Sequence, residues 1–118
     1  MKRIFAVLAL LLVAVSPAFA LSDEEYLTLK KSNADFAKAD RRLAQVWKEL
    51  KADLYKDAFA ELQKNQREWI ESGRDEEAED LMSEGYSKAE AYTIATNNRA
   101  DELPDIAVWV ERNLGLRQ

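Results

Sequence analysis

The sequence predicts an all-α protein, a small antiparallel bundle of three main helices with short helices at its termini. Glycine and proline are scarce, since residues 21–118 hold only Gly73, Gly85, Gly115 and Pro104. Alanine, leucine, glutamate, lysine and arginine dominate instead, and these residues favour helices. Apolar residues recur at three- and four-residue steps, and no segment alternates apolar and polar residues as a strand would. We therefore expect one helical domain.

Residues 1–20 have the three parts of a secretory signal peptide. Lys2 and Arg3 form the basic start, an apolar run of twelve residues follows, and the segment ends in the small-x-small pattern of residues 18–20. The apolar run is shorter than the ~20 residues of a membrane span, which makes a membrane-anchored first helix the weaker alternative. We expect cleavage after Ala20, a periplasmic or secreted protein without membrane attachment, and a single domain over residues 21–118.

The charge and the missing residue types limit the function. Without Lys2 and Arg3 the chain has 15 basic residues against 22 acidic ones, a net charge of −7. This charge disfavours nucleic acids and anionic membranes as partners and favours a cationic protein. The chain has no histidine, the usual zinc ligand and commonest general acid–base. It also has no cysteine, which excludes disulfides and a lipid-modified amino terminus.

The first two helices are predicted from their start signals. Ser22 with Glu25 forms a capping box that starts a short helix, and Ser32 or Asn33 starts the first long helix, which should end near Tyr55. The apolar stripe of that long helix contains Phe36, Leu43, Val46, Trp47, Leu50 and Leu54.

The second long helix should begin with Asp57 as its cap, after a break near Lys56. Its stripe contains Phe59, Leu62, Gln66, Trp69 and Ile70, and steps of four extend it through Arg74 and Ala78 to Leu81. The helix should therefore continue through the acidic run of residues 75–80, with the acids mostly in solvent. Gly85 is expected in the turn that follows.

A third helix should start at the capping box of Ser87 and Glu90 and should be stopped by Pro104, which lacks a backbone donor. The tail after Pro104 carries apolar residues at helical spacing and suggests a short closing helix. Trp47, Trp69 and Trp109 are expected as core anchors.

Three charged residues interrupt the apolar stripes. Asp40 follows Phe36 by one turn, Arg74 follows Ile70, and Arg99 lies one turn before Leu103. A lone charge in a core costs several kcal/mol. We therefore expect a partly buried ionic cluster, in which Asp40 pairs with Arg74 or Arg99.

The acidic run does not indicate an enzyme. Paired carboxylates can perform acid–base chemistry, but here they come without a histidine, a nucleophile beside a base, a glycine-rich phosphate loop or the spacing of a calcium loop. The sequence thus predicts no catalytic residue, metal or cofactor, and an acidic run is usually a solvated helix face. Tyr86, in the predicted turn, is a binding candidate, unless it folds back over the helix ends.

Three segments resemble the LprI-type lysozyme inhibitor family: residues 39–47 (ADRRLAQVW), 62–78 (LQKNQREWIESGRDEEA) and 83–103 (SEGYSKAEAYTIATNNRADEL). The resemblance covers roughly residues 32–103 and implies a small exported helical protein. The residues that it assigns to the architecture are Asp40, Leu43, Trp47, Gln66, Trp69, Arg74, Arg99 and Leu103. The chain departs from the family in lacking its helix-bridging cysteines, in Ala44, where asparagine is usual, and in Trp47, where tyrosine is common.

The resemblance implies a protein that inhibits lysozyme without catalysis, and lysozymes are commonly cationic enzymes with acidic clefts. The turn of Met82–Ser87 is our candidate for a segment that blocks the cleft, with the acids of residues 75–80 as an attracting rim. The predicted partner-binding residues are Asp75, Glu76, Glu79, Asp80, Glu84 and Tyr86. The alternative is an envelope interaction or stress-response module with a different protein partner. No oligomeric state is predicted.

Overall fold

The computed structural model describes residues 21–115, so the predicted signal peptide and residues 116–118 lie outside the described residues. The elements are α2 (Asp23–Ser32), α3 (Ala34–Asp53), α4 (Lys56–Glu68), the π-helical turn η1 (Trp69–Gly73), α5 (Arg74–Ser83) and α6 (Lys88–Asn113). The all-α prediction is confirmed, and residues 21–115 contain no strand. Over this range no helix is both long and apolar enough to cross a bilayer.

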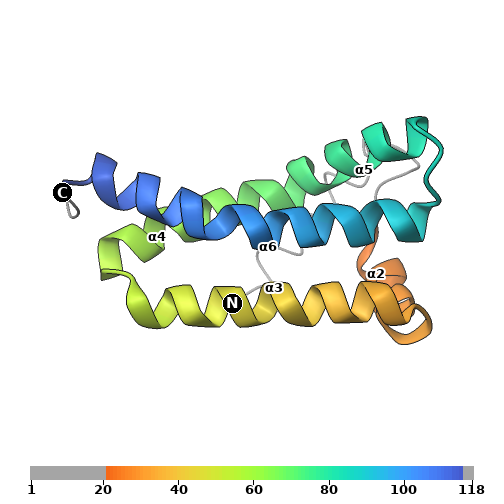
Figure 1. The fold of residues 1–118 in the computed structure, drawn as a ribbon, viewed down its shortest axis with the longest axis horizontal. Coiled ribbons are helices and arrows are strands. Elements are labelled where there is room, and N and C mark those ends of the chain that lie inside the picture. Colours follow the sequence, from red (N-terminus) through yellow and green to blue (C-terminus); the bar gives the residue numbers. More distant parts are fainter. Residues whose placement is uncertain (1–20, 116–118) are drawn as a thin grey trace.

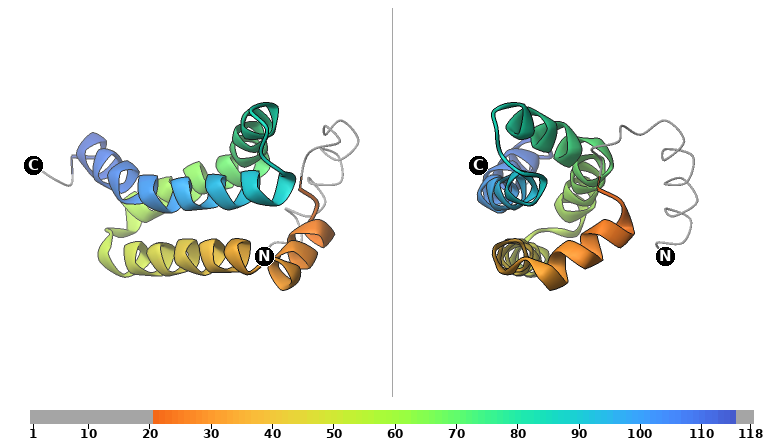
Figure 2. Two further views of the ribbon diagram at one scale, coloured as in Figure 1. Left: turned by 45° about the vertical axis from the view of Figure 1, so that its right-hand side comes forward. Right: turned by 90° about the vertical axis from the view of Figure 1, so that its right-hand side faces the viewer.

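The chain runs along α3, returns along α4, η1 and α5, and runs back along α6 (Figure 1). The middle run is therefore antiparallel to both α3 and α6. Helix α6 is the centre of the packing, because it contacts α3, α4 and α5. Helix α2 packs on α3 and is inclined to it, as Figure 2 shows.

The helix starts follow local capping. The Ser22 and Ser87 hydroxyls accept hydrogen bonds from the backbone N–H groups of Glu25 and Glu90, each at 3.1 Å, and both capping boxes are complete. The Asn33 Oδ1 accepts from the Phe36 N–H at 2.9 Å and caps α3. These side chains satisfy backbone donors that a helix leaves without intrahelical partners.

The predicted cap at Asp57 is wrong. Helix α4 begins at Lys56, and its N-cap residue Tyr55 makes no side-chain capping bond. Asp57 lies in the first turn of α4, where a carboxylate is favoured by the positive end of the helix dipole.

Pro104 does not stop the third helix, which is a second correction. Helix α6 passes through it to Asn113. Pro104 cannot donate to the carbonyl of Ala100, but Leu103, Ala107 and Val110 on either side are buried. Their packing holds the helix across the missing bond.

Trp109 is not a core anchor, because its side chain is 66% exposed. The uninterrupted helix directs Ala107 and Val110 inward, and Trp109 falls on the other side of α6. The predicted short closing helix is therefore the end of α6.

The core has two apolar clusters. The α4-end cluster joins α3, α4 and α6, and Trp47 packs on Phe59 with ring centroids 5.0 Å apart. Its members are Leu62, Leu103 and Ala107 with Leu43, Val46, Trp47, Leu50, Leu54, Phe59 and Ile106. The α5-end cluster joins α2, α3, α5 and α6, and its members are Leu21, Phe36, Ala78, Ala91 and Tyr92 with Tyr26, Leu29, Leu81 and Met82.

The π-helical turn η1 changes the phase of the middle run. Trp69 is buried, whereas Ile70, predicted on the same stripe, is 36% exposed. A Cβ atom on Gly73 would lie 3.1 Å from Cδ1 of Trp69, so glycine leaves room for the indole. After η1 the side chains of Arg74, Asp75 and Glu77 are partly buried, so two acids of the run are partly withdrawn from solvent.

Candidate partner-binding surface and the polar layer beside it

A polar layer separates the two apolar clusters on every long helix. On α3, Asp40 lies between Phe36 and Leu43, and on α6, Arg99 lies between Tyr92 and Leu103. The layer consists of Asp40, Asn65, Gln66, Trp69, Arg74, Asp75 and Arg99. Tyr26 and Tyr92 belong to the α5-end cluster and donate hydrogen bonds to Asp40 and Asp75 of the layer.

Arg99 is bound by neutral amides. The residue is 4% exposed, and its Nε donates to Oε1 of Gln66 at 2.7 Å while Nη2 donates to Oδ1 of Asn65 at 2.5 Å. The guanidinium carbon lies 5.4 Å from the ring centroid of Trp69. Burial lowers the pKa of Arg99, but an arginine stays protonated in proteins. This side chain ties α6 to α4 without a carboxylate.

The predicted pairing of Asp40 with Arg74 or Arg99 is wrong. Asp40 accepts a hydrogen bond from the Tyr26 hydroxyl at 2.7 Å and lies 3.2 Å from Nζ of Lys30. Both partners belong to α2, whose packing across α3 could not be read from the periodicity of either helix. Burial, followed by the hydrogen bond to Asp40, raises the pKa of Tyr26, so its hydroxyl remains a donor.

Arg74 is held by aromatic rings. Its guanidinium carbon lies 5.9 Å from the ring centroids of both Trp69 and Tyr92, a distance at which cation–π attraction operates. Its buried Nε has no hydrogen-bond partner among residues 21–115. Arg74 is thus a partly buried cation between α5 and α6, with its charge facing rings.

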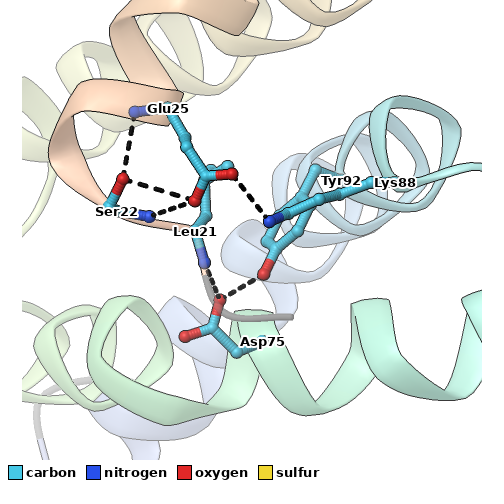
Figure 3. Close-up of polar contacts among 6 residues, drawn as sticks. All are labelled: Leu21, Ser22, Glu25, Asp75, Lys88 and Tyr92. Atoms are coloured by element: carbon cyan, nitrogen blue, oxygen red, sulfur yellow. Dashed lines mark hydrogen bonds and ion pairs between the residues drawn. The ribbon is translucent and has the colours of Figure 1, made fainter. Parts of the chain in front are cut away.

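Asp75 is turned toward the interior and away from the surface that we predicted for it. Its Oδ1 accepts from the Tyr92 hydroxyl at 2.5 Å and from the backbone nitrogen of Leu21 at 3.3 Å (Figure 3). Burial, then the hydrogen bond and the charge of Asp75, raise the pKa of Tyr92. Beside it, Lys88 of α6 lies 2.9 Å from Oε2 of Glu25 in α2.

The remaining predicted partner-binding residues are exposed. Glu76, Glu79 and Asp80 lie on α5, and Glu84 lies in the following turn. We call these four residues the acidic face. Glu77 differs, because its carboxylate accepts from the Asn98 amide of α6 at 2.7 Å.

The turn between α5 and α6 is short and hydrogen-bonded. The Gly85 N–H donates to the Met82 carbonyl at 3.0 Å and the Tyr86 N–H donates to the Leu81 carbonyl at 3.2 Å, while Gly85 has φ of 109°. This is the Schellman pattern of a helix end. Met82 and Ser83 belong to α5, so the cleft-blocking segment predicted from Met82 is reduced to residues 84–87. The turn presents Tyr86 with 43% of its surface exposed.

A pocket of about 230 Å³ lies beside Tyr86. Its lining residues are Asn33, Asp35, Tyr86, Glu90, Thr93 and Ile94. The pKa of Glu90 is lowered by hydrogen bonds from the backbone and hydroxyl of Ser87, which favours its charged form. Two carboxylates, an aromatic ring and an isoleucine suit the apolar stem and positive head of a lysine or arginine side chain.

Sequence reasoning did not include Asp35 and Glu90, which line the pocket, among the predicted partner-binding residues. Asp35 lies in the first turn of α3, and no sequence signal relates it to the turn before α6. Glu90 was recognised only as part of a capping box. Residues 21–115 contain no group of histidine, cysteine or acidic side chains that could hold a metal ion.

This architecture defines a small helical-bundle protein with an exposed acidic face and an exposed aromatic beside a pocket. The model of the family described as lysozyme inhibitor LprI matches residues 22–103. The match covers more than half of the chain, and the chain belongs to this family. The family is one of inhibitors and not of enzymes, in agreement with the prediction. No curated protein and no solved structure matches the chain.

Proposed function

We propose that this protein is an exported, acidic inhibitor that binds cationic lysozyme and blocks it without catalysis. The observation that carries the proposal is the family match over residues 22–103. The net charge of −7 for residues 21–118 supports it, as does the exposure of the acidic face. Export rests on the signal-peptide pattern of residues 1–20, with cleavage after Ala20.

The acidic face steers the two proteins together. Opposite charges raise the rate of encounter more than they raise the final affinity. Because salt screens exposed charges over about 8 Å at physiological ionic strength, inhibition should weaken as salt is added.

Residues 84–87 and the pocket form the contact itself. Tyr86 supplies an exposed aromatic of the kind that often dominates binding energy. The pocket lined by Asp35 and Glu90 receives a lysine or arginine of the lysozyme surface. The turn is hydrogen-bonded to α5, so little conformational freedom is lost on binding.

A lytic assay tests the proposal directly. Purified Leu21–Gln118 at micromolar concentration and low salt should reduce lysis of bacterial cell walls by a cationic c-type lysozyme. Unchanged lysis would reject inhibition of that enzyme type and favour the alternative of a different envelope protein as partner.

Matched variants locate the surface. Reversing Glu76, Glu79 and Asp80 to lysine should raise the inhibitor concentration for half-inhibition about tenfold, mainly through slower association. The control reverses three exposed acids outside the acidic face, Asp53, Glu61 and Glu68, and changes the net charge equally. If both triple variants lose the same potency, only the net charge matters and the assigned face is wrong.

Tyr86→Ala tests the contact separately from the charge. It should raise the half-inhibition concentration by about tenfold or more, as expected for an aromatic hot spot. Tyr55→Ala is the control, because Tyr55 is 59% exposed in the turn between α3 and α4. Equal potency of the two variants would place the contact elsewhere.

A further inference from the structure

We infer that the amino terminus created at Leu21 by signal-peptide removal is a structural part of the protein, in which its ammonium group forms a partly buried ion pair with Asp75. The inference rests on the cleavage site of the proposed function and does not depend on lysozyme binding.

Leu21 is placed as a core residue although it precedes the first helix. Its side chain is 9% exposed and belongs to the α5-end cluster with Phe36, Ala78 and Tyr92. Residues near a chain end are poorly ordered unless they are tied down. The burial of Leu21 therefore fixes the position of its backbone nitrogen.

That nitrogen lies against a carboxylate. The distance from Leu21 N to Oδ1 of Asp75 is 3.3 Å, and the same oxygen accepts the Tyr92 hydroxyl at 2.5 Å (Figure 3). Asp75 is partly buried, and among residues 21–115 no lysine or arginine forms an ion pair with it. A partly buried carboxylate without a cation is costly. A positive charge beside Asp75 would therefore stabilise the folded state.

Cleavage supplies that charge. Hydrolysis of the Ala20–Leu21 peptide bond consumes one water, leaving a carboxylate on Ala20 and an amine on Leu21. The amine takes up a proton at neutral pH, because an α-amino group has a pKa of about 8. A neutral amide donor thus becomes an ammonium, and a hydrogen bond between two charged groups is about twice as strong as a neutral one.

The neighbouring charges do not compete for the new ammonium. Glu25 accepts from the Lys88 ammonium at 2.9 Å and from the backbone of Ser22, and the guanidinium of Arg74 lies over the Tyr92 ring. The ion pair would join the start of the chain to α5, and through Tyr92 to α6. It would therefore stabilise the end of the bundle that carries Tyr86.

The experiment begins with export of the full chain from bacteria. The mass of the exported protein should correspond to an amino terminus at Leu21. This protein is then compared with one that carries an added glycine before Leu21, each with Asp75 and with Asp75→Asn. The added residue keeps an ammonium but moves it away from the carboxylate.

The extension should lower the melting temperature by about 5 °C when Asp75 is present and by about 1 °C or less in the Asp75→Asn background. A second measurement does not rely on melting. The pKa of the α-amino group, followed by NMR, should lie above about 8 in the Asp75 protein and near 8 in Asp75→Asn.

A terminus at another residue, an equal effect of the extension in both backgrounds, or an unchanged α-amino pKa would overturn the inference. None of these measurements uses lysozyme. A protein that fails to inhibit lysozyme but shows the coupling would reject the proposed function and leave this inference standing. A protein that inhibits lysozyme but shows no coupling would reject this inference and leave the proposed function standing.

Discussion

The two ends of the bundle are held by different forces. At the α4 end, Leu62 and Leu103 are fully buried among apolar side chains of three helices. At the α5 end, the apolar cluster is bordered by hydrogen-bonded pairs of tyrosine and aspartate, Tyr26 with Asp40 and Tyr92 with Asp75. Apolar contacts have no preferred direction, whereas hydrogen bonds do.

This difference matters because the candidate partner-binding surface lies at the α5 end. The turn of residues 84–87 and the pocket need fixed positions for the starts of α3 and α6. The hydrogen bonds and the Glu25–Lys88 ion pair position α2 against its neighbours at the same end. We conclude that the apolar contacts of the α4 end mainly stabilise the fold. The polar contacts of the α5 end mainly fix the positions of the helices that carry the candidate surface.

The largest effect should come from the α4 end. Leu103→Ala removes a fully buried side chain and should lower the free energy of unfolding by about 2–5 kcal/mol. Chemical denaturation followed by circular dichroism measures it. Leu27→Ala is the control at a 57% exposed position, and comparable losses in the two variants would contradict the assigned core.

Pro104→Ala should act in the opposite direction at the same end. It restores a backbone donor inside α6 and replaces the least favourable helix residue. The free energy of unfolding should rise by about 1–3 kcal/mol, since Pro104 is exposed and no packing is lost. A decrease in the same denaturation experiment would mean that the proline is required for the course of α6.

Tyr92→Phe tests the α5 end. It removes the hydroxyl that donates to Asp75 and should cost about 1–2 kcal/mol of unfolding free energy. If geometry is the main role of this bond, Tyr92→Phe should weaken lysozyme inhibition, whereas Leu103→Ala should not while the protein remains folded. The opposite pattern would break the proposed division between the two ends.

Glu25→Gln should give the smallest effect. Hydrogen bonds from Lys88 and then from the Ser22 backbone lower the pKa of Glu25. The ionised Glu25 carboxylate therefore adds to the free energy of unfolding above its unfolded pKa of about 4.3. This stabilisation is lost as the pH falls through the lower pKa of the folded state. At neutral pH the variant should lose below about 0.5 kcal/mol, because the pair is exposed, and acidification should abolish the difference.

Glu90→Gln is the matched control for this experiment. Glu90 occupies the same position of the second capping box, and glutamine preserves such a box. Its variant should show a smaller change at neutral pH, because no ion pair of Glu90 is found among residues 21–115. An equal change in both variants would show that the Glu25–Lys88 pair contributes nothing.

Sequence reasoning predicted the helix starts at Ser22, at Ser32 or Asn33, and at Ser87, because each signal spans only three or four residues, and the structure selects Asn33 for the second start. It failed at Pro104 and at η1. At Pro104 the buried residues Leu103, Ala107 and Val110 hold α6 across the missing hydrogen bond, and at η1 Gly73 leaves room for the Trp69 indole; periodicity predicts neither. The exposed residues of the acidic face were predictable, because a charged run on a helix is usually solvated.

The sequence by itself determined the class of fold, the positions of most helices and the acidic character of the chain, since these follow from composition and from short-range periodicity. Only the tertiary structure decided which partner each interior charge has and which residues meet beside Tyr86. Asp40 binds α2, Asp75 binds Tyr92 and Leu21, and Asp35 reaches the pocket. These contacts join residues far apart in the chain, and they depend on how the helices cross.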